Sequence, residues 1–179
     1  SVFPFNRFQG QDILLSPEMK STGEVMGLDA DLGKAYAKSQ MAAHAPLPLE
    51  GKIFISVSEP DKAQIAELAG QFAELGFELV CTSGTARALR AAGIEVQEIR
   101  KVSEGRPNSL DLLKNGDIQM VINTPDGQVP RADEVKIRTT AVYSRVPIMT
   151  TLSSAKAAAS AIGALKKDGY DVLAIQSYH

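Results

Sequence analysis

The fold of this chain is decided by the stretch Ile53-Phe54-Ile55-Ser56-Val57 and the helical pattern that follows it. A short run that is β-branched and apolar at successive positions is typical of a strand buried on both faces of a sheet. From about Asp61 to Gly76, apolar residues recur at helical spacing and predict an amphipathic helix: Ile65, Leu68, Ala69, Phe72 and Leu75. A buried strand followed by an amphipathic helix is the repeating unit of a parallel α/β sheet.

The same alternation continues to the end of the chain. Further strands are predicted over residues 77–81, 94–99, 120–123 and 146–149, with 172–175 as one more short strand. Further helices, three of them ended by glycine, are predicted over residues 85–92, 109–115, 132–143 and 153–167. Five strands that each lead into a helix predict a doubly wound α/β fold. This is a three-layer sandwich in which helices cover both faces of a five-stranded parallel sheet.

The first fifty residues have a different pattern from the rest. Residues 17–27 contain two glycines and a proline without a sustained hydrophobic period, so they predict a loop. Residues 29–43 predict a short helix, and the two prolines of residues 44–51 predict a linker. The sequence therefore divides into a leading segment at 1–28, a helix and linker at 29–50, and one domain at 51–179.

Composition and charge exclude several classes of function. The 179 residues carry 19 basic and 21 acidic side chains, whereas a nucleic-acid surface needs a basic excess. No apolar run approaches the roughly 18–20 residues of a membrane span, so we expect neither nucleic acid nor membrane as a partner. Cys81 is the only cysteine and is expected to be a buried strand residue. One cysteine and two histidines, His44 and His179, are too few for a metal site built from Cys and His, so we expect none.

Polar and basic side chains follow the predicted strands where a doubly wound sheet binds ligands, at the carboxyl edge. Lys62 falls in the first turn of a helix, where the dipole disfavours a cation by about 0.3–1 kcal/mol unless an anion faces it. The turn Thr82-Ser83-Gly84-Thr85 combines hydroxyls and glycine before a helix N-terminus, as phosphate binding requires. The alternatives are a solvated lysine and a turn in which Thr82 or Ser83 caps the helix.

Two more loops add to this edge. The loop from Arg100 to Pro107 holds three cations, and Asn123-Thr124 ends a strand with an amide and a hydroxyl. Each alone is compatible with an ordinary solvated loop or turn. Together they predict a site for a small phosphorylated ligand, formed by Lys62, Thr82, Ser83, Thr85, Lys101, Asn123 and Thr124.

Several motifs resemble the large subunit of carbamoyl phosphate synthetase: Val57-Ser58-Glu59-Pro60-Asp61-Lys62, Gly76-Phe77-Glu78-Leu79, Thr82-Ser83-Gly84-Thr85, Lys101-Val102-Ser103-Glu104-Gly105-Arg106-Pro107 and Ile122-Asn123-Thr124. The resemblance spans essentially all 179 residues. It implies the C-terminal regulatory domain of the methylglyoxal-synthase-like group, which has a five-stranded parallel sheet. Residues 17–27 resemble the end of an ATP-grasp domain, so 1–28 would be its remnant. Because the chain also lacks an initiator Met, we expect a piece of a larger enzyme.

The resemblance implies an allosteric domain that binds nucleoside monophosphates, with UMP inhibiting and IMP activating in bacterial members. It implies phosphate and ribose contacts at Lys62, Thr82, Thr85, Lys101 and Asn123. Ser56 and Asp133 match more loosely, and Thr150 would lie near a site for ornithine at the domain boundary. No catalytic residue and no cofactor is implied within this chain.

For the parent enzyme the resemblance implies a cytoplasmic, glutamine-hydrolysing ligase that uses ATP, Mg and K. A small glutaminase subunit and homo-oligomer contacts are implied as its partners. Its product, carbamoyl phosphate, would enter pyrimidine and arginine biosynthesis.

The sequence departs from the family pattern after Asn123-Thr124. Family members carry a second Thr, a small residue, Gly and basic residues there, whereas this chain has Pro125-Asp126-Gly127-Gln128-Val129. Fewer hydroxyls and cations, together with the added Asp126, should weaken contacts with a phosphate or base.

Two other functions stay open at this point. A methylglyoxal synthase acting on dihydroxyacetone phosphate would need a carboxylate base and a histidine. This chain has Glu104-Gly105-Arg106-Pro107 in the corresponding loop and no His between Gly51 and Tyr178. The other possibility is an oligomerisation module with a vestigial pocket.

Overall fold

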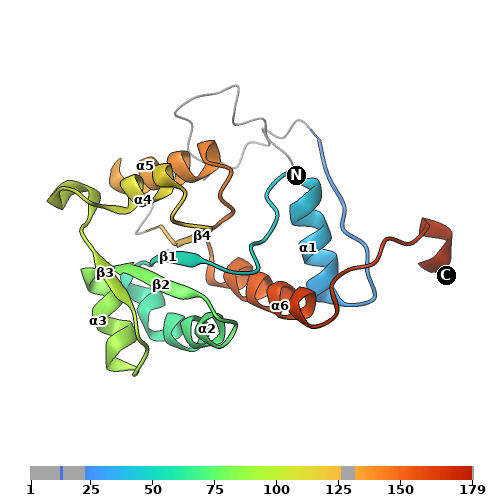
Figure 1. Ribbon diagram of the computed structural model, residues 1–179, viewed down its shortest axis with the longest axis horizontal. Coiled ribbons are helices and arrows are strands. Elements are labelled where there is room, and N and C mark those ends of the chain that lie inside the picture. The colour runs from blue at the N-terminus through green and yellow to red at the C-terminus, as the bar shows by residue number, and fades with distance from the viewer. Residues whose placement is uncertain (1–12, 14–22, 126–131, 179) are drawn as a thin grey trace.

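The computed structural model describes residues 13, 23–125 and 132–178 (Figure 1). At its centre lies a sheet of five strands: β1 (Lys52–Ser56), β2 (Glu78–Thr82), β3 (Gln97–Ile99), β4 (Met120–Asn123) and β5 (Ile148–Met149). All neighbouring strands pair in parallel, in the order β3-β2-β1-β4-β5. The predicted five-stranded parallel sheet is therefore confirmed.

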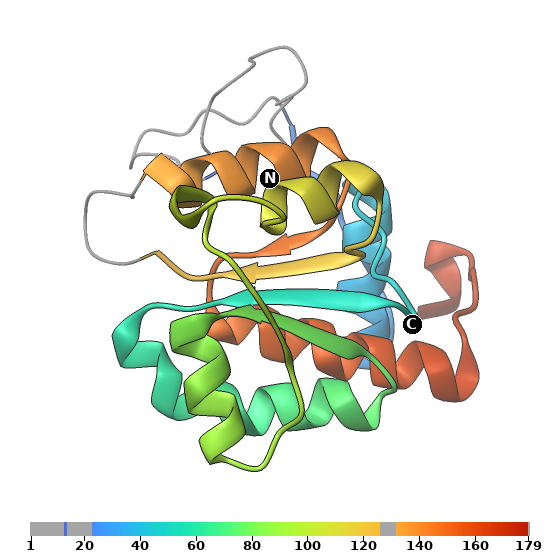
Figure 2. The same ribbon diagram turned by 60° about the vertical axis from the view of Figure 1, so that its left-hand side comes forward.

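Helices cover both faces of the sheet, which makes three layers (Figure 2). One face is covered by α2 (Lys62–Glu74), α3 (Ser83–Ala91) and α6 (Leu152–Asp168), and the other by α4 (Ser109–Asn115) and α5 (Ala132–Tyr143). The chain moves outward from β1 to β3 on one side and from β4 to β5 on the other. Because crossovers between parallel strands are right-handed, opposite directions of travel put the connecting helices on opposite faces.

The position of β1 at the centre of the sheet explains why its sequence is a continuous apolar run. Ile53 and Ile55 are fully buried under α2 and α6, whereas Phe54 is fully buried on the opposite face with residues of α4 and α5. Successive side chains of a strand point to opposite faces, so a strand with a core on each side must be apolar at every position.

Some element boundaries differ from the prediction. β1 is displaced by one residue, α3 begins two residues early at Ser83, and β3 lacks residues 94–96. β5 is limited to two residues because Pro147 has no N–H to donate; its carbonyl oxygen instead accepts from the Val121 N–H at 2.9 Å.

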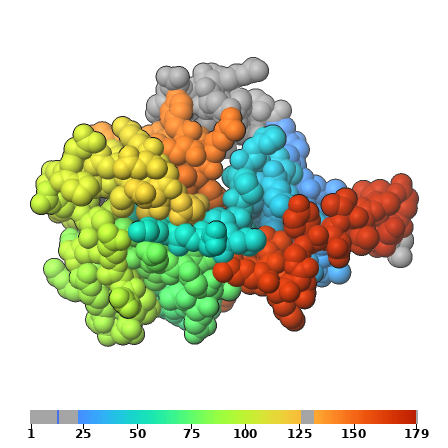
Figure 3. Space-filling model, viewed as in Figure 1, coloured from blue at the N-terminus to red at the C-terminus, as the bar shows by residue number. Residues whose placement is uncertain are grey.

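The predicted strand at residues 172–175 is wrong. Residues 171–174 form no strand, and Ile175–Tyr178 is a short 3-10 turn. This tail follows α6 and projects from one end of the molecule (Figure 3), and the ribbon of Figure 1 shows it apart from the strands of the sheet. Its apolar side chains, including Val172, are largely exposed, since no sheet edge is within reach to pair with them.

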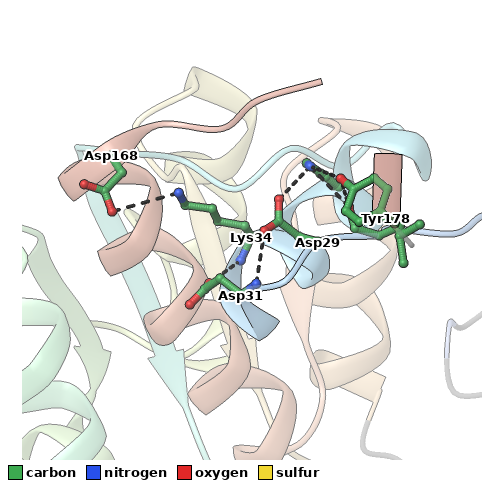
Figure 4. A network of polar contacts seen from close by, with 7 residues as sticks. Asp29, Asp31, Lys34, Asp168 and Tyr178 are labelled. Carbon is green, nitrogen blue, oxygen red and sulfur yellow. Dashed lines mark hydrogen bonds and ion pairs between the residues drawn. The ribbon is translucent and has the colours of Figure 1, made fainter. Parts of the chain in front are cut away.

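A helix at residues 29–43 is confirmed as α1 (Leu32–Ala42), which lies against α6. The Asp31 carboxylate caps it by accepting the Lys34 N–H at 2.8 Å. Polar contacts also join the segment before α1 to the C-terminal tail, where the Tyr178 hydroxyl donates to the Leu28 carbonyl oxygen at 3.0 Å (Figure 4). Nearby, a hydrogen bond from the Lys38 ammonium lowers the pKa of Asp29.

The division of the chain at residues 28 and 50 stays a prediction. Most of the leading segment, residues 1–12 and 14–22, lies outside the described residues. Within the described part of the chain, the structure contains no helix with the length and apolar character that a membrane crossing requires.

We expect Cys81 to be chemically silent in the folded protein. It is fully buried, as predicted, and this burial raises its pKa to about 12. At pH 8 the native protein should therefore leave a disulfide reagent such as DTNB unreacted while the urea-unfolded protein reacts completely. Labelling of the native thiol at the rate of free cysteine would contradict the burial of β2.

We expect two glycine-to-alanine changes to have opposite effects. A Cβ on Gly70, in α2, meets nothing within 4 Å, so Gly70→Ala should raise the free energy of unfolding by about 0.5–1 kcal/mol. A Cβ on Gly33, in α1, meets the Ser160 carbonyl oxygen at 3.0 Å and the Ala161 Cα at 3.2 Å. Because the backbone of α6 must shift to make room, Gly33→Ala should lower the free energy of unfolding by about 1 kcal/mol. Urea denaturation measures both, and equal stabilisation would refute close α1–α6 packing.

Candidate functional site

The carboxyl ends of β1 and β4 meet at the centre of the sheet. Ser56 and Asn123, the last residues of these strands, are paired in register. The Asn123 Nδ2 donates to the Ser56 carbonyl oxygen at 3.1 Å. Strand order reverses between β1 and β4, and in doubly wound sheets this reversal opens the crevice where ligands bind.

Two buried threonines hold the loop between β1 and α2. The Ser58 N–H donates to the Thr124 Oγ1 at 2.9 Å, and the Val57 N–H donates to the Thr85 Oγ1 at 3.4 Å. Ser58 in turn donates its hydroxyl to the Asp61 Oδ2 at 2.8 Å. Thr85 and Thr124 were predicted as ligand contacts, and the structure shows that their oxygens also position the loop that leads to Lys62.

Lys62 is the first residue of α2, and its ammonium reaches the beginning of α3. A Cβ added to Gly84 would lie 3.2 Å from the Lys62 Nζ. Thr82 occupies the N-cap position of α3, but its side chain makes no capping hydrogen bond. A cation and uncapped helix N–H groups therefore converge at the Ser83-Gly84 turn, an arrangement that favours an anion.

The Lys62 ammonium has an acidic neighbour that an incoming anion could replace. It forms an ion pair with Glu59, whose side chain is 78% exposed, while that of Lys62 is 23% exposed. Exposed ion pairs contribute only about 0–1 kcal/mol, so exchanging this carboxylate for a ligand anion costs little.

The other predicted residues lie in neighbouring loops of the same edge. Lys101 begins the 3-10 turn Val102–Glu104 after β3, and its half-exposed side chain places Nζ 3.9 Å from the Glu104 Oε1. Asp133, in the first turn of α5, accepts the Ser103 N–H at 3.1 Å, so it joins α5 to this turn. Thr150 follows β5, two strands away from β1.

Sequence reasoning missed Arg138, in α5. Its side chain is 0% exposed, and its Nη1 donates to the Asn123 Oδ1 at 3.0 Å. The same nitrogen lies 3.7 Å from the Glu134 Oε2. The only available signal was the i,i+4 spacing of Glu134 and Arg138, which is equally common on solvated helix faces.

The departures from the family pattern begin directly after Thr124. Pro125 is described and half-buried, whereas residues 126–131, including the departures from Asp126 to Val129, lie outside the described residues. Within the described residues no group of three or more His, Cys, Asp or Glu side chains could hold a metal ion.

Two hollows lie beside the helices. One, of about 440 Å³, runs between α2 and α6, and the other, of about 210 Å³, lies between the segment before α1 and the C-terminal tail. Neither is lined by a predicted site residue. The candidate site at the strand ends therefore rests on its polar groups and on the topological rule that places a crevice there.

Comparison with known proteins places this fold in a family. Residues 64–150 match the family model of the MGS-like domain. The chain is 48% identical over 178 residues to a carbamoyl phosphate synthase large chain from Acidobacterium capsulatum, covering 99% of this chain and 16% of the relative. It is also 48% identical over 180 residues to the C-terminal section of a carbamoyl phosphate synthase large chain from Methanopyrus kandleri, covering 100% and 33%.

A solved structure agrees with the observed fold. The crystal structure of methylglyoxal synthase from Elizabethkingia anophelis is similar with a TM-score of 0.51 at 16% identity, covering 74% of this chain and 91% of that one. At this identity the likeness concerns the fold alone. The sequence matches reach further, and they show that the chain carries an MGS-like domain and belongs with the carbamoyl phosphate synthase large chains, spanning 16% of the length of the bacterial relative.

Proposed function

We propose that the crevice at the carboxyl ends of β1, β2 and β4 is an allosteric site for a nucleoside monophosphate of the UMP or IMP type. The observation that carries this proposal is the Lys62 ammonium beside Gly84, at the uncapped start of α3. A phosphate there would meet a cation, helix N–H groups and the hydroxyls of Thr82 and Ser83.

The rest of the crevice suits the sugar. Ser56, Asn123 and Thr124 bring a hydroxyl, an amide and a second hydroxyl to the switch point, next to the proposed phosphate position. Among the described residues, the ion pair of Lys101 is the long, half-exposed one with Glu104, so its flexible side chain can turn toward a bound anion at small cost. Asp133 adds an acceptor for sugar hydroxyls from the start of α5.

The proposal for the whole protein rests on its relatives, since this chain spans a small part of their length. We propose a cytoplasmic, glutamine-dependent carbamoyl phosphate synthase that serves pyrimidine and arginine biosynthesis. ATP, Mg and K would act in domains outside this chain, alongside a small glutaminase subunit and homo-oligomer contacts. Ornithine would act near Thr150. Effector binding would shift the enzyme between two states, with a coupling typically of about 1–3 kcal/mol.

Methylglyoxal synthase activity has less support. The Glu104 carboxylate accepts the Lys101 N–H at 2.9 Å, so it is engaged in shaping its own turn. The domain also has no His between Gly51 and Tyr178. The fold likeness to a methylglyoxal synthase says nothing about chemistry, because one fold hosts unrelated functions.

The test is a calorimetric titration of the chain with UMP and IMP, with uridine and inosine as uncharged counterparts. We expect Lys62→Ala to weaken nucleotide binding about 10- to 100-fold, which corresponds to a charge-assisted hydrogen bond of about 1.5–3 kcal/mol. Nucleoside binding should change little, and Lys101→Ala should act in the same direction. Lys52→Ala is the matched control, because Lys52 pairs with Glu78 at the opposite end of β1.

Two results would count against the proposal. If Lys62→Ala lowered the affinity for nucleotide and for nucleoside equally, Lys62 would not be a phosphate contact. Absence of any phosphate-dependent binding to the unaltered chain would reject the site itself.

A further inference from the structure

A buried guanidinium lies against the carboxyl end of β4. Arg138 belongs to α5, is 0% exposed, and its Nη1 donates to the Asn123 Oδ1 at 3.0 Å. Asn123 in turn bridges to β1, where its Nδ2 donates to the Ser56 carbonyl oxygen at 3.1 Å. A single chain of hydrogen bonds thus runs from α5 through β4 to β1, across the point where strand order reverses.

This chain of hydrogen bonds is compatible with one orientation of the Asn123 amide. A guanidinium has only donors, and a backbone carbonyl has only an acceptor. Rotating the amide by half a turn would place NH₂ against the guanidinium and oxygen against the Ser56 oxygen, so both contacts would become repulsive. The Asn123 oxygen must therefore face Arg138, and its nitrogen must face β1.

Arg138 is poorly suited to act as the counter-ion of a phosphate. Its Nη1 lies 3.7 Å from the Glu134 Oε2, and the Glu134 side chain is only 14% exposed. The two side chains are close enough to form an ion pair, and the guanidinium is shielded from solvent. Its effect on a ligand would therefore pass through the groups that it contacts, and Asn123 is the one at the end of β4.

We propose that Arg138 is a positioning residue that holds the Asn123 amide with its N–H side toward β1, so that the crevice accepts a ligand oxygen at that point. An amide nitrogen has two hydrogens, and the Ser56 carbonyl takes one of them. The second can meet a sugar hydroxyl oxygen. This inference rests on the proposed function for the ligand, but the orientation of the amide can be measured without one.

The first arm of the test is NMR of the free chain, in which the Asn123 side-chain NH₂ signals are assigned by their disappearance in Asn123→Ala. We expect two well-separated, slowly exchanging signals in the unaltered chain. In Arg138→Met, which keeps length but loses every donor, these signals should move toward those of a solvated asparagine. Arg138→Lys keeps a cationic donor group and should stay closer to the unaltered chain. Lys114→Met, an exposed lysine of α4, is the charge-matched control.

The second arm is a double-mutant cycle on UMP or IMP affinity. We expect Arg138→Lys to weaken binding about threefold or more in the unaltered chain and to have no effect in Asn123→Ala, because a residue that acts through another is non-additive with it. Arg138→Lys is used in this cycle, rather than Arg138→Met, because full removal of a buried ion-pair partner can prevent folding.

Two outcomes would overturn the inference: unchanged Asn123 signals in folded Arg138→Met, or losses of affinity that add in the cycle. If the unaltered chain binds no nucleotide, the proposed function fails, while the NMR arm still decides the orientation of the amide.

Discussion

The structure depends on burying β1 on both of its faces. As the central strand, β1 satisfies its backbone groups on β2 and β4, while Ile53 and Ile55 enter one core and Phe54 the other. Parallel strands need crossovers, and right-handed crossovers in opposite directions place helices on both sides. The same arrangement leaves the carboxyl ends of β1 and β4 as the point where neighbouring loops diverge, so the crevice is a consequence of the core.

Polar groups at this crevice both build it and line it. Burying a hydroxyl or amide is costly unless it is hydrogen-bonded. Thr85, Thr124 and Asn123 meet this condition by bonding to the backbone of β1 or the loop after it. Thr124 also donates its hydroxyl to the Ser58 Oγ at 3.4 Å, whereas the Asn123 Nδ2 carries a second hydrogen besides the one given to Ser56. The loop that begins α2, and therefore the Lys62 ammonium, is held by the side chains that an effector would contact.

The chemistry of the edge fits binding better than catalysis. It offers a cation, helix N–H groups, hydroxyls and an amide, which are the groups that the proposed phosphorylated ligand would need. The Glu104 carboxylate, in the loop that would correspond to the catalytic loop of a methylglyoxal synthase, is engaged in its own turn. The shared fold leaves the function open, since function resides in the particular residues at the strand ends.

The sequence alone determined the alternation of strands and helices, the two-sided burial of β1 and most residues of the carboxyl edge, because these follow from local periodicity and from the topology that periodicity implies. Tertiary structure decided the rest. Residues 172–175 have a strand-like composition, but a strand needs a partner edge, and the tail lies away from the sheet. Arg138 has the sequence context of a surface residue, and only the packing of α5 over β4 buries it against Asn123. Pairing and burial are contacts between distant segments, which no local pattern contains.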